Sequence, residues 1–469
     1  MRKIGIFVVS LVVFAFLYAG SALAVDVKFS GSFDAAGLYE KRPNLHKTDA
    51  STAFFYQQFR LKTVFGVSPG LSLTTELAAL EKIWGDTHWT GTRGNSYGRE
   101  SNGGWARVAE NIEVQAAYVT YDAGAPGTFI VGYVPHDTQW GTIWGTSYRP
   151  HGIIQWRKPV GNFGFGLKYM KNREGSNNYK SYNTGNFVTG NDVDSNVYVG
   201  NVTYKNDVVF TGFKWAYLDG KDMKPATNIY GQAGEWKTTG HLLTPFVILN
   251  LGPVKIEAEL EHFTGKRKFQ NRPGSNDDVS MRTWAFYLDG EFTHGPISAG
   301  ATYAYASGND PASGVMGRLP DTSYTSWGGL DYNPGLILWN EDRNNWRGPL
   351  GGAHLGTTKN IGNQVTSGVS NAHMISLYAK FRPTEDWDLK FVYLFARAAE
   401  LPESAPGQRF RSKTYGHEVD LIATYKITSN LKYMVGAGYL FAGDYFKGGD
   451  RTFKVKDDYL FTNKLTLTF

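Results

Sequence analysis

Apolar side chains alternate with polar or small ones along most of this chain after residue 24. The first such segment places apolar or small residues at every second position, namely Val25, Val27, Phe29, Gly31, Phe33 and Ala35. A period of two is typical of a β-strand whose two faces meet different surroundings. Turn residues separate each alternating segment from the next, so the pattern predicts consecutive strands.

Eighteen segments of this kind can be delimited, at residues 25–40, 52–67, 71–84, 111–122, 128–135, 151–158, 163–171, 195–205, 208–218, 241–251, 254–264, 281–292, 297–307, 373–382, 388–398, 415–427, 431–442 and 457–469. Short connections lie at residues 68–70, 123–127, 159–162, 206–207, 252–253, 294–296, 384–386 and 429–430. Long connections lie at residues 41–51, 85–110, 136–150, 172–194, 219–240, 265–280, 308–372, 399–414 and 443–456.

Short and long connections take turns along the chain. Transmembrane β-barrels of the bacterial outer membrane have this arrangement, with an even number of strands, short periplasmic turns and longer extracellular loops. A soluble β-sandwich has no reason to sort its connections by length. The sequence therefore predicts an all-β fold, a transmembrane antiparallel β-barrel of about 18 strands.

Residues 1–24 predict a secretory signal peptide. Arg2 and Lys3 precede an apolar run, and Ala22-Leu23-Ala24 forms a small-x-small cleavage site. An uncleaved membrane anchor is the alternative for this segment. No later segment offers the ~20 consecutive apolar residues that a spanning helix needs. Residues 25–469 are therefore expected to occupy the membrane as one closed barrel domain.

The apolar face of each strand is expected to point outward. A barrel of this size encloses a lumen too wide for side chains to fill, so an apolar lining would face water. Aromatic residues also gather near the predicted strand ends, where interfacial girdles form. These residues are Tyr39, Tyr121, Trp284, Phe292, Tyr305, Trp387 and Tyr425. For any one of them, ordinary β-propensity is the alternative explanation.

Composition narrows the chemistry. The chain has no cysteine, which excludes disulfides, thiolate metal sites and covalent haem attachment. Its formal net charge of +6 is spread without a Lys/Arg run, which argues against nucleic acid as a partner. His417-Glu418 lacks the second His of a zinc helix, and the run from Asp192 lacks the later ligands of a calcium loop. We predict no enzyme activity, metal or cofactor, with a membrane-embedded enzyme as a minor alternative.

The inward positions of the predicted strands carry charges of both signs. The basic ones are Arg60, Lys62, Lys82, Lys168, Lys214, Lys255, Lys380, Arg382, Lys390, Lys432 and Lys464. The acidic ones are Glu76, Glu113, Glu257, Glu259, Glu261, Asp289, Glu291, Glu418 and Asp420. Segments 254–264 and 281–292 would form an acidic wall, opposite mainly basic strands near the two ends of the chain. Such walls would set a field across the pore and an ion preference. The alternative is that the charges pair locally and only keep the lumen hydrated.

Two long connections are candidates for a constriction. Residues 135–152 are rich in aromatic and basic groups, and residues 308–372 are too long for a structureless loop. The candidate constriction residues are Trp140, Trp144, Tyr148, Arg149, Arg318, Arg343 and Arg347. Indole faces stack on sugar rings, and Arg binds carboxylates or phosphates with two parallel hydrogen bonds. The alternative is that these loops pack on themselves at the outer surface.

The last segment ends at Phe469, with Leu467, Leu465, Phe461 and Tyr459 on the same face. A terminal aromatic residue on an alternating strand resembles the signal read by the barrel-assembly machinery, which is therefore an expected partner. Outer-membrane lipid and lipopolysaccharide are the other partners that this architecture predicts.

The last two hairpins resemble the alginate-export family of outer-membrane barrels. The resemblance rests on residues 416–421, Tyr425, residues 429–431, residues 436–439 and residues 442–446. Members of that family form eighteen-stranded barrels, and its exporter moves an anionic polysaccharide through an Arg-lined pore. The lumen inferred here carries mostly Lys together with many carboxylates, so that substrate is not carried over.

These features predict a porin-like channel for the passive diffusion of small polar or charged solutes, with saccharides among them. One alternative is an export pore for an anionic polysaccharide. Another is a structural barrel that sheathes a partner protein.

Overall fold

The computed structural model describes residues 25–85, 112–136, 140–143, 147–173, 194–224, 234–269, 279–308, 315–316, 333–351, 355, 365, 368–405 and 408–469. The predicted leader at residues 1–24 lies outside this part of the chain and stays a prediction. Among the described residues, no helix is both long and apolar enough to cross a membrane.

Within the described residues, long antiparallel strands dominate. They are β1 (Asp26–Glu40), β2 (Thr52–Ser68), β3 (Leu71–Ile83), β4 (Ile112–Asp122), β5 (Thr128–His136), β6 (Ser147–Val160), β7 (Phe163–Arg173), β8 (Ser195–Lys205), β9 (Val209–Lys224), β10 (Gly234–Leu251), β11 (Val254–Phe269), β12 (Val279–His294), β13 (Ile297–Ala306), β15 (Ala372–Phe381), β16 (Trp387–Arg397), β19 (Thr414–Lys426), β20 (Leu431–Ala442) and β21 (Asp458–Thr468). The remaining elements are short: β14 (Val315–Met316), β17 (Glu403–Ala405), β18 (Gln408–Arg409), the helix α2 (Glu341–Arg347) and the 3₁₀ turn η4 (Asp444–Lys447).

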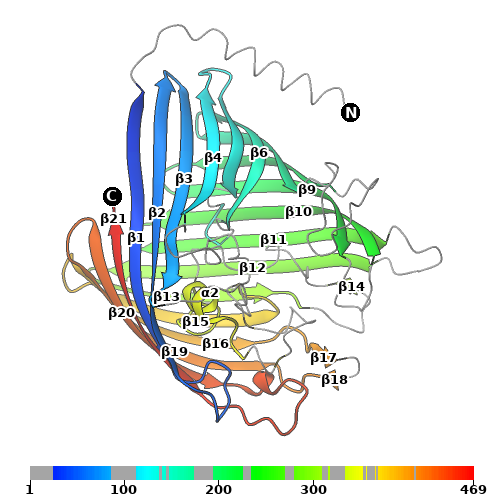
Figure 1. Cartoon of the computed structure of the whole chain (residues 1–469), viewed down its shortest axis with the longest axis vertical. Helices are drawn as coiled ribbons and strands as arrows, with labels where there is room; N and C mark the ends of the chain where they lie inside the picture. The colour runs from blue at the N-terminus through cyan, green and yellow to red at the C-terminus, as the bar shows by residue number, and fades with distance from the viewer. Residues whose placement is uncertain are drawn as a thin grey trace.

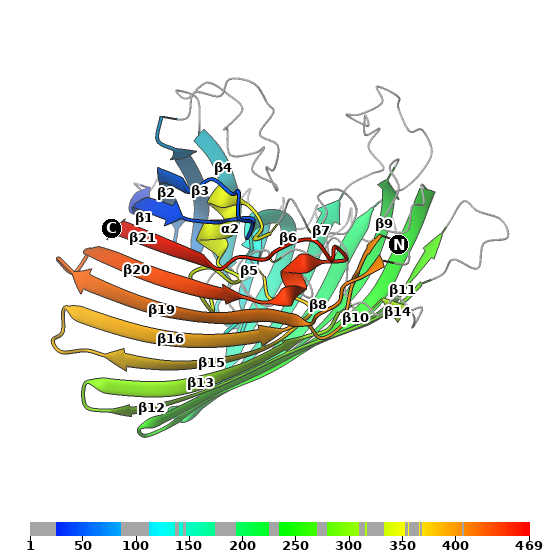
Figure 2. The same cartoon turned by 90° about the horizontal axis from the view of Figure 1, so that it is seen from below.

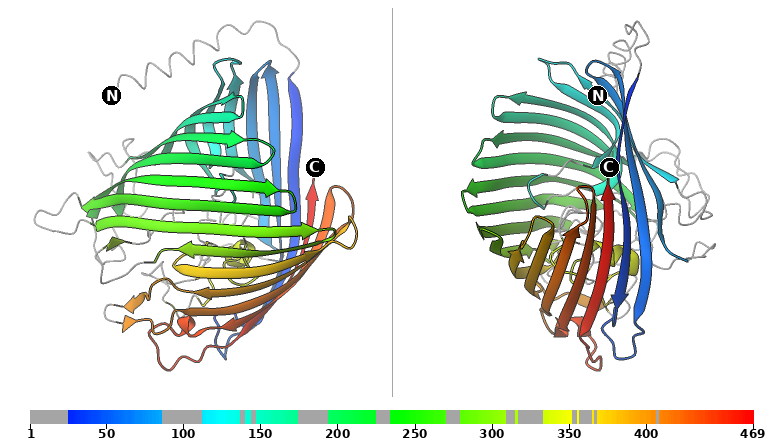
Figure 3. Two further views of the ribbon diagram at one scale, coloured as in Figure 1. Left: turned by 180° about the vertical axis from the view of Figure 1, so that it is seen from behind. Right: turned by 90° about the vertical axis from the view of Figure 1, so that its left-hand side faces the viewer.

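Each long strand pairs antiparallel with the next, and the last closes on the first. In that closing pair, β1 and β21 run in register from Ser32 opposite Thr468 to Glu40 opposite Leu460. Figures 1 and 3 show the sheet curling round until β21, in red, lies beside β1, in blue. The predicted fold, a closed antiparallel barrel of 18 strands, is confirmed.

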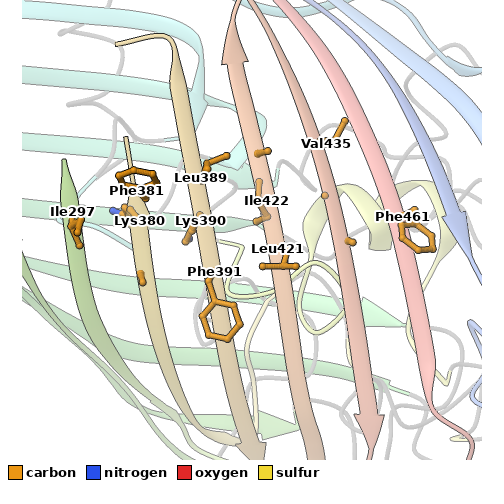
Figure 4. Close-up of a pocket in the computed structure, with 14 residues that line it drawn as sticks. Ile297, Lys380, Phe381, Leu389, Lys390, Phe391, Leu421, Ile422, Val435 and Phe461 are labelled. Carbon is orange, nitrogen blue, oxygen red and sulfur yellow. The ribbon is translucent and has the colours of Figure 1, made fainter. Parts of the chain in front are cut away.

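The outer wall is apolar, as predicted. Phe391, Leu421 and Phe461 are 43%, 61% and 54% exposed, whereas Val392, beside Phe391, is buried on the inner face. Figure 4 shows these three exposed side chains on β16, β19 and β21, with β20 between the last two, around a hollow of about 650 Å³. Ala379, Ala423 and Ala437 contribute to its lining. Such a wall can lie in hydrocarbon, because its outward side chains are apolar and the closed barrel leaves no strand edge with unpaired backbone groups.

Two pieces of chain fold into the barrel from opposite sides. The first, residues 333–350, contains α2, and we call it the inner segment; Figure 2 shows α2 enclosed by the wall near β1 and β21. The second, residues 140–143, is a turn that packs against β9–β11, and we call it the inner turn. Trp140 of the inner turn belongs to one apolar cluster, whereas Ile143 joins the cluster that contains Leu336 to Trp339 of the inner segment.

Candidate functional site

Carboxylates of β19 hold the start of the inner segment. The backbone N–H groups of Ile337 and Leu338 donate to Glu418 at 2.7 and 2.8 Å, and that of Leu336 donates to Asp420 at 3.2 Å. Gly335 lies so close that an added Cβ would be 2.6 Å from Glu418 Oε1. Hydrogen bonds to a charged acceptor are among the stronger ones in proteins, so these contacts fix the segment against the wall.

The helix α2 is tied to the closing strands. Arg343 donates through Nε to Glu40 Oε1 of β1 at 2.7 Å, and its Nη2 lies 2.6 Å from the same oxygen in a buried ion pair, with side chains only 2% and 0% exposed. Asp342 forms an ion pair with Lys464 of β21 at 3.0 Å. The side chain of Asn340 caps the helix by accepting from the Arg343 N–H. Thus strands from both ends of the chain contribute to one attachment site.

Apolar contacts complete this attachment. Trp346 stacks on Tyr56 of β2 with ring centroids 4.6 Å apart, and Trp339 meets Tyr415 edge to face at 5.3 Å. Arg347 ends the helix, and burial lowers the pKa of its guanidinium. Of the candidate constriction residues, Arg343 and Arg347 therefore lie inside the barrel.

The inner turn is held from the opposite wall. Trp140 donates through Nε1 to the Thr244 carbonyl at 2.7 Å, and Lys214 Nζ lies 4.5 Å from the centre of its ring. The N–H groups of Thr142 and Ile143 both donate to Glu259 Oε2, at 2.9 and 3.0 Å. The turn therefore narrows the lumen from the β9–β11 side. Trp144 and Arg318 lie outside the described residues, as do the side chains of Tyr148 and Arg149.

A polar cavity of about 220 Å³ lies in the lumen beside the start of the inner segment. It is lined by Lys255, Glu257, Tyr287, Asp289, Glu291, Thr302, Asn333, Pro334, Ser376, Tyr378, Lys380 and Lys390. Acidic residues of β11 and β12 thus meet basic residues of β15 and β16 around one space. We call it the charged cavity.

Most charges of this cavity are paired. Lys255 lies 2.5 Å from Glu257, and Lys380 reaches across β13 to within 2.5 Å of Glu291. Asp289 accepts from Thr302 at 2.5 Å and from Tyr378 at 2.9 Å. Lys380 of β15 can reach Glu291 of β12 because the strand between them, β13, carries Gly300 at this level. A Cβ on Gly300 would lie 2.4 Å from the Tyr378 hydroxyl. The pair of Lys380 and Glu291 therefore joins the basic wall to the acidic wall across β13.

The other charged residues that were predicted to line the lumen lie at different heights in the barrel. On β2 and β3, Lys62 lies 3.4 Å from Glu76, and Arg60 lies 3.4 Å from Glu81. The inner faces of further strands also carry Glu113, Lys168 and Glu261, the last buried on β11 next to Glu259. Lys432 and Arg382 lie at the periplasmic end, where Arg382 is 63% exposed and pairs with Asp388 at 3.0 Å. These two are outside the narrow part of the lumen.

Lys82 does not face the lumen, contrary to the sequence prediction. It is paired with Gln57, which lies on the outer face next to the buried Tyr56. A register shift occurs between Gln57 and Phe59, and Leu80 has a positive φ of 54°. An extra residue in one strand turns every later side chain to the other face. As a result Glu81 points into the lumen, and Lys82, which the sequence predicted to point inward, points outward.

Phe469 lies on the outer face at the periplasmic end. Its backbone pairs with Gly31, and its ring is 6.4 Å from that of Phe59. Its predicted role as an assembly signal stays a prediction.

Sequence reasoning missed several residues of the site, notably Glu40, Glu81 and Tyr378. Glu40 and Tyr378 occupy inward positions of predicted strands, so the alternation itself could have found them. Glu81 follows a bulge, which the residue types do not signal.

Comparison with known proteins supports the architecture. No protein-family model matches the chain, and no curated protein sequence matches it. Among solved structures, OccK8 (OprE) of Pseudomonas aeruginosa is similar with a TM-score of 0.52 and 13% identity, over 95% of this chain and 98% of that one. The fold is that of an outer-membrane porin barrel.

Further structures match with lower scores. OccK10 (OpdN) of Pseudomonas aeruginosa has a TM-score of 0.49 and 12% identity, over 94% of this chain and 99% of that one. A loop-deletion mutant of OmpT, an outer-membrane protein of Vibrio cholerae, has a TM-score of 0.41 and 10% identity, over 95% of this chain and 100% of that one. With its closed barrel and apolar wall, the chain is a protein of the bacterial outer membrane. The resemblance to the alginate-export family is not confirmed by these matches.

Proposed function

We propose that this barrel is a passive channel for small polar or charged solutes, with saccharides among its permeants. The observation that carries this proposal is the charged cavity, which lies in the lumen beside the anchored inner segment. Its fixed charges favour hydrated permeants over apolar ones. Its paired Lys and carboxylate groups offer hydrogen bonds of both polarities to a passing solute.

The two inward-folded pieces favour small solutes over polymers. The inner segment occupies the β19–β21 side of the lumen, and the inner turn occupies the β9–β11 side. Carboxylates fix both through backbone N–H groups, so neither yields without losing charge-assisted hydrogen bonds. A polysaccharide in transit would need a wider and continuous bore.

Reconstitution tests the proposal. The full chain in planar bilayers should show ohmic conductance, and in liposomes it should admit polyols and sugars at rates that fall steeply with solute size. The same preparation, heat-unfolded before reconstitution, serves as the control. Absence of conductance together with a stably co-purifying protein would instead indicate a structural barrel. Selective block by long uronate oligomers would indicate an export pore.

A further inference from the structure

A second hollow, of about 370 Å³, opens on the outer wall at the extracellular end of β13, β15 and β16. It is lined by Tyr303, His373, Ile375, Phe395, Arg397, Ala398, Ala399 and Lys413. His373 is paired with Arg397 across β15 and β16, and the residues on either side of each, Ala372, Met374, Ala396 and Ala398, are buried inside the barrel. Both side chains therefore point away from the lumen. We call this feature the rim hollow.

The height of the rim hollow follows from the strand connections. At the other end of these strands, residues 295–296 and 382–386 form the short periplasmic turns. His373 is the second residue of β15 and Arg397 is the last of β16, so both stand at the extracellular end. Aromatic rings surround them: Tyr305 lies 4.8 Å from the His373 ring, and the Tyr303 hydroxyl lies 2.9 Å from His373 Nδ1. Aromatic belts of this kind mark the level of lipid headgroups.

The rim hollow carries an excess of positive charge. Arg397 is exposed and makes no hydrogen bond or ion pair with any of the described residues. Lys413 donates to the Ala399 carbonyl and lies 3.6 Å from Glu400. Among the residues that the structure describes, two cations thus stand against one carboxylate, and Arg397 keeps its guanidinium available. A free guanidinium at a membrane surface matches the geometry of a phosphate, which it binds with two parallel hydrogen bonds.

Below the cations the lining becomes apolar. Ile375, two residues further along β15, is 46% exposed, and Phe395 stands two residues before Arg397 on β16. The register gives two levels, because His373 is paired with Arg397 at the rim and Ile375 is paired with Phe395 one level nearer the membrane centre. A phosphorylated lipid likewise presents its phosphate first and its acyl chain below.

We propose that the rim hollow binds the phosphorylated headgroup of an outer-leaflet lipid. The phosphate lies on Arg397 and Lys413, and the start of an acyl chain lies along Phe395 and Ile375. The occupant is a membrane lipid and not a soluble anion, because the apolar floor is continuous with the lipid-facing wall. This site depends on the location in the outer membrane and not on the channel activity.

Lipid binding to the purified full chain tests the proposal. The delipidated protein in detergent is titrated with bisphosphorylated lipid A, and bound lipid is counted by native mass spectrometry. The chain carrying Arg397→Gln and Lys413→Gln together should bind about ten- to a hundred-fold more weakly, because it loses the charge-assisted bonds to phosphate. Arg397→Lys, which keeps the charge but loses the planar fork, should fall between them.

Arg282→Gln is the matched control. Arg282 is an exposed cation on the outer face of β12, between the buried residues Met281 and Thr283 and away from the rim hollow. An equal loss with this variant would show general charge attraction and overturn the proposal. Equal binding of dephosphorylated lipid A would also overturn it, as would displacement of the lipid by millimolar inorganic phosphate. Heat-modifiable migration and unchanged conductance establish that each variant folds.

Discussion

Gly141 decides how closely the inner turn approaches the wall. Its φ is +68°, in the left-handed region, and an added Cβ would lie 2.4 Å from Glu259 Oε2. Glycine is therefore required here twice, once for the backbone angle and once for the approach of the carboxylate that holds the turn.

We expect Gly141→Ala to loosen the inner turn and raise the single-channel conductance. A β-carbon at this position would push Glu259 away from the N–H groups of Thr142 and Ile143, and backbone strain of about 1–3 kcal/mol adds to that loss. The measurement is conductance in planar bilayers. Gly252→Ala is the control, because Gly252 has a similar φ of +65° in a periplasmic turn with nothing within 4 Å. Equal changes in both variants would show that strain alone, without the contact to Glu259, is responsible.

The buried pair of Arg343 and Glu40 gives a second prediction at the residue scale. Both side chains are almost fully buried, so removal of one partner leaves an uncompensated charge. We expect Arg343→Met to cost about 3–5 kcal/mol, seen as a lower Tm by circular dichroism in detergent. Adding Glu40→Leu should restore most of the loss, since an apolar pair of similar volume replaces the ion pair. Additive losses in the double variant would contradict this account.

Among the elements, the inner segment depends on acceptors that the barrel supplies from far along the chain. Glu418 takes two of its N–H groups, and no other strand offers a carboxylate to Ile337 or Leu338 within the described residues. The position of the segment is therefore a property of β19 as much as of its own sequence.

We expect Glu418→Gln to release the start of the inner segment. Each charge-assisted hydrogen bond is worth about 1.5–3 kcal/mol, and a neutral amide oxygen replaces only part of that. Liposome swelling should then admit larger sugars than it does with the unmodified chain. Glu385→Gln, in an exposed periplasmic turn, serves as the control and should leave the size limit unchanged. An unaltered size limit in Glu418→Gln would show that the apolar contacts of the segment suffice to hold it.

The elements also show how far the sequence could be read. The alternation located all the long strands, because lipid outside and water inside impose a period of two. It made β10 and β11 too short at their extracellular ends. The structure begins β10 at Gly234 and continues β11 to Phe269, whereas the alternation gave residues 241 and 264. Beyond the hydrocarbon both faces are polar, as at the exposed Lys266 and the buried Arg267, so the period disappears while backbone pairing continues.

The sequence predicted the interior of the barrel less well than its wall, for three physical reasons. Val392 and Leu394 interrupt the polar inner face of β16 because they pack against the inner segment and not against water. The bulge near Leu80 turns Lys82 outward without any signal in residue type. The length of residues 308–372 indicated an inward fold, but the inner segment and its partners Glu40 and Glu418 lie too far apart in sequence for local patterns to join them.

At the scale of the whole molecule, the distribution of charge decides what the lumen favours. The pairs of Lys255 with Glu257 and Lys380 with Glu291 leave the wall of the charged cavity close to neutral. Removing the carboxylates should therefore leave the lysines unpaired, and removing the lysines should leave the carboxylates unpaired. Glu259 and Glu261 are unsuited to this test, because the first anchors the inner turn and the second is buried beside it.

We expect the joint exchange of Glu257→Gln and Glu291→Gln to shift the ion preference toward anions. The two lysines then face the lumen without carboxylate partners, and an interaction of about 1 kcal/mol near water corresponds to roughly a five-fold change in the permeability ratio. Reversal potentials in a salt gradient measure that ratio. The converse exchange, Lys255→Gln with Lys380→Gln, keeps the same two sites and should shift the preference toward cations. Because the two variants differ only in which partner is lost, opposite shifts would place these pairs on the permeation path. Identical reversal potentials in both would mean that ions pass elsewhere in the barrel.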